Sequence, residues 1–172
     1  MVIGEGPCVA FDTDRPRVAI KHAVMAQNLD PAAVTRSVIF AVSMIGLLVA
    51  HQLGDHVIQT DRQAAGKAGG HGWWWPMAGH LAGYHAVAAA VVVGTGALLG
   101  LPLTVRGVVA GLAFSALTHG LLDRRWPVRA VLRAFGSPRF AEATAPICGI
   151  YAADQALHKL ALLGSALMIA LL

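Results

Sequence analysis

The chain has 172 residues, of which 56% are hydrophobic and only 13% are charged. Soluble globular proteins average about 25% charged residues, so this composition, with a mean hydropathy of +0.62, excludes an ordinary soluble domain and indicates a polytopic membrane protein. The formal net charge of +4 comes mostly from arginines between apolar blocks, and no aromatic-interleaved basic face is present, which excludes a nucleic-acid-binding domain. The two cysteines, Cys8 and Cys148, are too far apart to indicate a cysteine metal site or a disulfide scaffold.

The N-terminal residues 1–35 predict a polar tail that is partly disordered or contains a short surface helix at RVAIKHAVMAQN. This stretch has no apolar core of signal-peptide length and carries acidic residues where a signal peptide is basic. We therefore expect the first apolar segment of the following domain, residues 36–172, to act as its own membrane anchor.

Four apolar segments are long enough to cross a bilayer as helices, which takes roughly 20 residues. The first follows Asp30-Pro31, an N-cap residue with proline at the first helical position. The predicted spans are about 37–60, 76–100, 103–124 and 146–172.

The connections indicate a compact bundle at the membrane surface. Residues 61–75 form a glycine-rich loop that ends in three tryptophans, which are typical of the headgroup level, although a substrate-gripping lid would also fit. Residues 127–135 place apolar and arginine side chains on opposite faces, as in an interfacial helix. GALLG at 96–100 and GVVAG at 107–111 are small-residue patterns that allow close helix packing. The predicted fold is all-α: an integral membrane four-helix up-down bundle with a short interfacial helix between helices three and four.

Polar residues occur at corresponding ends of all four predicted helices. In an up-down bundle these ends share one membrane side, so the polar residues form a single layer. Three histidine–aspartate pairs have i,i+4 spacing, so each shares one helix face. On the second helix, His80 and Tyr84 share a face, while His85 lies about 140° from His80, and His80 is favoured to point inward. The pairs are His51–Asp55, His119–Asp123 and Asp154–His158.

This layer predicts a metal site. An intramembrane carboxylate costs about 2.5–3.5 kcal/mol at a helix centre, so the aspartates of this layer need compensating partners. A divalent cation, zinc or manganese, would satisfy imidazole and carboxylate together. A structural polar lock without metal and a proton or ion pathway are the alternatives. The predicted ligands are His51, Asp55, His80, His119 and His158, with Asp123 and Asp154 as further ligands or as the catalytic general base.

The elements HQLGDHVIQTD, His80, THGLLD at 118–123 and DQALH at 154–158 resemble a family of small bacterial membrane proteins of unknown function. Its members carry a similar H-x-x-G-D-x-x-x-Q-T first helix and a downstream lysine, here Lys67. The layout is also similar to that of inner-membrane proteins described as membrane-bound metal-dependent hydrolases. The resemblance covers roughly residues 47–160, departs from the family at His56, and implies a four-helix membrane protein with a metal site.

We therefore expect metal-assisted hydrolysis of a membrane-associated lipid or lipid-linked phosphate, with Gln59, Lys67 and Tyr84 as substrate-binding residues. A non-catalytic membrane scaffold and a proton- or ion-coupled transport subunit are the alternative functions. The expected partners are the bilayer and a lipid-linked substrate, with self-association left open and no nucleic acid. The excess of basic residues in the loops beside the polar layer places that layer on the cytoplasmic side of a bacterial inner membrane.

Overall fold

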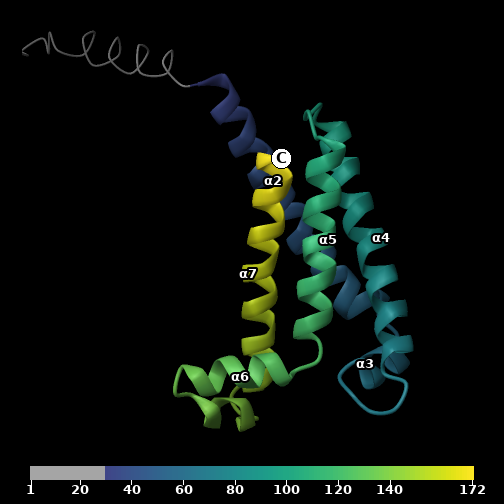
Figure 1. The fold of residues 1–172 in the computed structure, drawn as a ribbon, viewed down its shortest axis with the longest axis vertical. Helices are drawn as coiled ribbons and strands as arrows, with labels where there is room; N and C mark the ends of the chain where they lie inside the picture. The colour runs from purple at the N-terminus through teal and green to yellow at the C-terminus, as the bar shows by residue number, and fades with distance from the viewer. Residues whose placement is uncertain (1–29) are drawn as a thin grey trace, which may run out of the picture. The chain divides into compact units, whose positions relative to one another are not determined.

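The computed structural model describes residues 30–172, which form helices and turns without any strand (Figure 1). The chain divides into two compact units, Met1–Val34 and Thr35–Leu172. The predicted surface helix of the N-terminal tail lies outside the described residues. Everything that follows concerns the second unit, apart from the first turn of helix α2.

Helix α2, Pro31–Leu53, begins where the sequence predicts a helix start. Asp30 Oδ1 accepts a hydrogen bond from the backbone N–H of Ala32 at 3.0 Å, which satisfies one of the unpaired donors of the first turn. A π-helix, η1, continues α2 over Gly54–Ile58.

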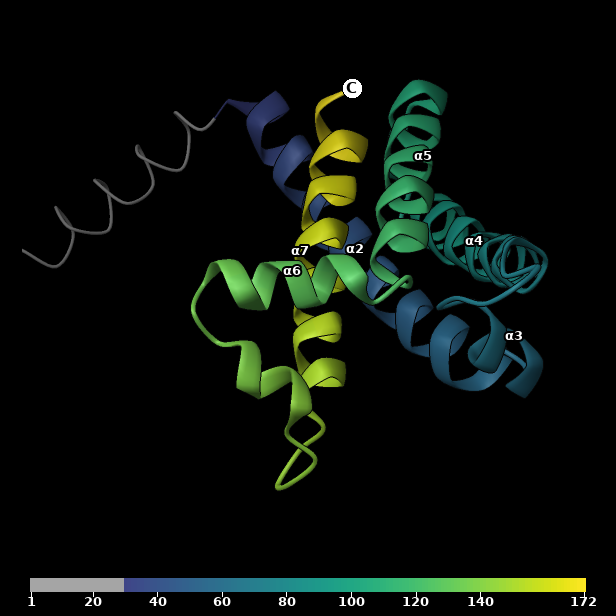
Figure 2. The same ribbon diagram turned by 60° about the horizontal axis from the view of Figure 1, so that its bottom comes forward.

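Three more long helices complete the unit: α4 (Trp74–Leu98), α5 (Val105–Leu122) and α7 (Gly149–Leu171). Helix α5 lies between α7 and α4 in both views (Figures 1 and 2). Gly107 at the start of α5 lies against Ile169 at the end of α7, so these two helices are antiparallel. Gly96 near the end of α4 lies against Leu103, just before α5.

Helices α5 and α7 approach most closely where the GVVAG segment lies. A Cβ atom at Gly111 would lie 2.5 Å from Ile169 Cγ1 and 2.8 Å from the Ser165 carbonyl oxygen. Only a residue without a side chain fits there, so this glycine sets the separation of the two helices.

Apolar side chains cover both the inside and the outside of the long helices. Leu47, Val92 and Leu162 belong to the buried core, whereas Ile45 and Leu117 are well exposed. Exposed apolar surface on this scale marks contact with lipid or with other proteins. Three segments, Pro31–Ile58, Trp74–Leu98 and Val105–Leu122, are long and apolar enough to cross a membrane.

Three of the predicted spans are thus confirmed as helices long and apolar enough to cross a membrane. Helix α7 is not among them, and its first half carries Asp154, Gln155, His158 and Lys159. The fourth span stays a prediction.

The connection at 61–75 is not the plain loop that its glycines suggest. It contains α3, Asp61–Gly66, whose start is fixed by a capping box. The Thr60 hydroxyl accepts a hydrogen bond from the Gln63 backbone N–H, and the Gln63 side chain accepts one from the Thr60 backbone N–H.

The expected helix at 127–135 is present as α6, Trp126–Ala134, and a short 3₁₀ helix, η2, follows at Pro138–Glu142. Arg125, which precedes α6, adopts a left-handed backbone with φ of 61°.

Candidate metal centre

The predicted polar layer is one buried cluster. Each long helix contributes one histidine that is at most 2% exposed. They are His51 near the end of α2, His80 early in α4, His119 near the end of α5 and His158 early in α7. Because buried polar groups need partners, their immediate neighbours decide what the cluster can do.

The first helix reaches the cluster through the π-helix. The backbone N–H of Gln59 donates to the carbonyl of Gly54 at 3.0 Å, which is the wide turn of a π-helix. The Gly54 backbone lies so close to α4 that a Cβ atom there would be 2.5 Å from the ring of Tyr84. Such turns are rare and occur frequently at functional sites, and this one holds the Asp55 carboxylate among the histidines.

Two imidazole nitrogens, His80 Nε2 and His119 Nε2, each lie close to two carboxylate oxygens, Asp55 Oδ1 and Asp123 Oδ2. His80 Nε2 lies 3.2 Å from Asp55 Oδ1, 3.3 Å from Asp123 Oδ2 and 2.9 Å from His119 Nε2. His119 Nε2 lies 3.3 Å from Asp55 Oδ1 and 3.2 Å from Asp123 Oδ2. We call these four residues the first group.

These separations match those between ligands of one small divalent cation. Ligands placed tetrahedrally at about 2.0–2.1 Å from zinc lie about 3.3–3.4 Å apart. Adjacent ligands of an octahedral ion with bonds of about 2.1 Å lie about 3.0 Å apart. Asp55 Oδ1 and Asp123 Oδ2 are also buried without an aligned hydrogen bond from any described residue. Asp55, His80 and His119 each offer one ligand atom within 4.8 Å of the others, so they could hold one cation.

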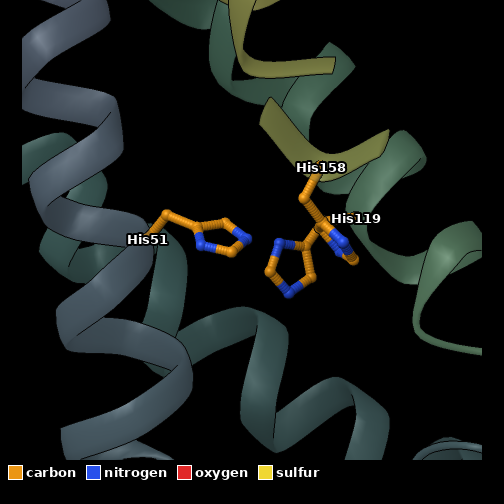
Figure 3. A group of neighbouring side chains, drawn as sticks. All are labelled: His51, His119 and His158. Carbon is orange, nitrogen blue, oxygen red and sulfur yellow. The ribbon is translucent and has the colours of Figure 1, made fainter. Parts of the chain in front are cut away.

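A second group of histidines adjoins the first. One nitrogen from each of His51, His119 and His158 lies within 4.8 Å of the others, and Figure 3 shows the three rings facing a common space. His158 Nδ1–H donates to the backbone carbonyl of Asp154 at 2.9 Å, which leaves Nε2 as the ligand nitrogen. Within the described part of the chain, His51 Nε2 and His158 Nε2 have no hydrogen-bond partner.

Lys67 is buried against the first group. Its ammonium lies 2.9 Å from Asp123 Oδ2 and 3.2 Å from His80 Nε2. This contact places a cation beside the Asp123 carboxyl, which favours its ionised form.

A polar cavity of about 200 Å³ opens beside the cluster and is lined in part by Asp55, Asp123 and Lys67. Gln59, predicted to bind substrate, also lines it, and its Oε1 atom is buried without a partner among the described residues. Arg125 lines the same cavity. Arg125 was not predicted as a site residue. Its left-handed backbone distinguishes it from the other basic residues of the connection.

Other predicted residues lie at the margin of the cluster. Asp154 lines the cavity, and its Oδ2 is 3.4 Å from His158 Nδ1, which places it behind a histidine. Tyr84 is 1% exposed, with its ring 4.2 Å from that of His119, so it packs against the cluster and does not line the cavity. His85 bonds to the Leu81 carbonyl and the Ser115 hydroxyl, in keeping with the choice of His80 as the inward histidine.

No family model matches this chain, and no curated protein and no solved structure matches it either. The family resemblance seen in the sequence therefore stays a prediction, and functional inference depends on the cluster itself.

Proposed function

We propose that this chain is an integral membrane protein that binds a divalent cation through Asp55, His80, His119 and Asp123 and hydrolyses a membrane-associated lipid or lipid-linked phosphate. The observation that carries this proposal is that two buried imidazole nitrogens each lie 3.2–3.3 Å from both Asp55 Oδ1 and Asp123 Oδ2, while Asp55 Oδ1 has no hydrogen-bond partner among the described residues. A polar lock would satisfy that buried oxygen with an aligned donor.

The residues at the cluster have two proposed roles, binding the cation and attracting the anionic substrate. His80 and His119 offer neutral nitrogens, while Asp55 and Asp123 offer charge, and a divalent cation held there would activate water and polarise a phosphoryl oxygen. Lys67 and the exposed Arg125 flank the cavity and would attract an anionic group.

The position of the cavity favours a substrate that stays in the bilayer. It has room for a polar headgroup, since one water occupies about 30 Å³ in the liquid, but not for acyl chains. Nearby, Trp74 and Trp75 stack on each other and are exposed, and Arg124 lies 3.5 Å over the ring of Trp73. Tryptophans with arginines are typical of the headgroup level, where a lipid presents its phosphate.

We further propose that the four long helices form an up-down bundle in a bacterial inner membrane, with α7 as the fourth span and α6 at the interface. Five exposed arginines lie in the connections beside the cluster, and they support a cytoplasmic side for it under the positive-inside rule. They are Arg62, Arg125, Arg129, Arg133 and Arg139.

Metal analysis combined with a phosphate-release assay tests the proposal. Full-length protein purified in detergent is expected to retain a divalent cation and to release phosphate from phosphatidic acid or from a lipid pyrophosphate in mixed micelles. His80→Ala should lose both properties. His71→Ala is the matched control, because His71 is an exposed histidine that does not line the cavity, and it should keep both. Protein that binds no cation would refute the site, and a cation-loaded protein inactive on both lipids would favour the non-catalytic scaffold.

A further inference from the structure

We propose that the cluster holds two divalent cations, bridged by the carboxylates of Asp55 and Asp123. This inference rests on the proposed metal binding and extends it. The first cation would lie between His80 and His119, as above, and the second would lie between His51 and His158.

Each carboxylate directs one oxygen to each histidine pair. Asp55 Oδ1 lies 3.2 Å and 3.3 Å from the Nε2 atoms of His80 and His119, while its other oxygen, Oδ2, lies 3.5 Å from His51 Nε2. This division of the two oxygens is the arrangement of a bridging carboxylate.

Asp123 repeats the pattern from the neighbouring helix. Its Oδ2 lies 3.3 Å and 3.2 Å from the Nε2 atoms of His80 and His119, and its Oδ1 lies 3.9 Å from His158 Nε2. Two carboxylates from different helices therefore separate the same two histidine pairs in the same way.

The second pair of histidines otherwise has no explanation. His51 Nε2, His158 Nε2 and His119 Nδ1 are all buried and, as far as residues 30–172 show, unpartnered. The ring centroids of His51 and His158 are 5.0 Å apart. Three unsatisfied imidazole nitrogens in one buried space are costly, and a single cation in the first group would leave those of His51 and His158 unsatisfied. A second cation satisfies both.

Charge also favours two cations for the proposed reaction. The cavity is lined by three carboxylates and two basic side chains, so a second divalent cation would make its net charge more positive than one cation would. The cavity that these residues line would then attract an anion such as a phosphate group. Paired cations about 3.5–4 Å apart commonly clamp phosphate in this manner.

The contacts predict unequal affinities. The first group is compact, with separations of 2.9–3.3 Å, while the second shows 3.5 Å and 3.9 Å contacts to its carboxylates. We expect Mn²⁺ to fill the first group before the second.

The test is a Mn²⁺ titration of the full-length protein in detergent, followed by electron paramagnetic resonance and metal analysis. The first equivalent should give an isolated Mn²⁺ signal, and the second should convert it to the spectrum of an exchange-coupled pair. His158→Ala should halve the bound metal and keep the isolated signal, and the exposed-histidine control His71→Ala should retain two ions.

The outcomes separate this inference from the one it rests on. One ion per wild-type chain, with an isolated signal at saturation and no loss in His158→Ala, would overturn the second site and leave the first intact. No bound Mn²⁺ at all would overturn both. The wild-type titration needs no substitution, so an unstable variant cannot hide the answer.

Discussion

The contact between α5 and α7 predicts that Gly111→Ala will destabilise the protein and weaken the second cation site. The new methyl group would lie 2.5 Å from Ile169 Cγ1 and 2.8 Å from the Ser165 carbonyl oxygen. Carbon atoms pack at about 3.5–4.0 Å. The Ile169 side chain can rotate, but the carbonyl belongs to the helix backbone, so the two helices must separate by roughly 0.5–1 Å, on the scale of this packing distance.

The expected cost follows from that separation. Overpacking of a tight contact typically costs about 1–3 kcal/mol. Asp123 and His158 lie on opposite sides of the same helix contact, 3.9 Å apart, and metal-ligand distances tolerate only about 0.2 Å of change. The second group should therefore lose affinity, while the first, built from η1, α4 and α5, should keep its ion.

Gly94→Ala is the matched control, because nothing lies within 4 Å of a Cβ atom at that helical glycine. It should be neutral or stabilising by up to about 1 kcal/mol, the usual gain of alanine over glycine in a helix. Equilibrium unfolding in mixed detergent micelles measures the stability, and metal analysis measures the ions. Equal stability of Gly111→Ala and Gly94→Ala, or equal loss of both ions in Gly111→Ala, would refute the reasoning.

Three further predictions follow from single contacts. Lys67→Met should lower the free energy of unfolding by about 3–5 kcal/mol in chelator-treated protein, because it leaves Asp123 buried without a cation. The loss should be much smaller in metal-loaded protein. An equal loss in thermal scans of both forms would argue against a metal ion beside Asp123. Thr60→Val should cost about 1 kcal/mol through loss of the α3 cap, with Thr60→Ser as the neutral control, and hydrogen exchange of α3 should report it; unchanged exchange would contradict the cap. In a Cys8→Ser background, the exposed Cys148 should resist an impermeant maleimide in intact cells and react after permeabilisation, and labelling of intact cells would place the cluster outside.

Local sequence signals predicted most of the helices. The Asp30-Pro31 pair marks the start of α2, and the amphipathic pattern at 127–135 marks α6 within one residue of its observed bounds. Helix α3 was missed because the surrounding glycines suggested a loop, although its T-D-R-Q start at Thr60 is a capping-box sequence. A stricter search for capping boxes could have found it.

The cluster was predictable because helix periodicity alone places residues four apart on one face. His51–Asp55 and His119–Asp123 are close, at 3.5 Å and 3.2 Å. The position of Lys67 was not predictable in this way, since its ammonium reaches Asp123 from a separate turn after α3. The sequence indicates how many charged residues the layer contains, but it does not show which basic side chain contacts which carboxylate.

The π-helix connects the packing of the bundle to the candidate site through one aromatic ring. Tyr84 presses against the backbone at Gly54, and its ring contacts those of His119 and His51 at centroid distances of 4.2 Å and 5.8 Å. The residue that excludes a side chain from the wide turn thus also supports two of the histidines. Because Tyr84 does not line the cavity, this arrangement favours a positioning role over direct substrate contact. The Tyr84 ring would hold His51 and His119, ligands of the two proposed cations, in fixed positions. Because Gly54 has no side chain, the ring can approach the backbone of the π-helix closely enough to do so.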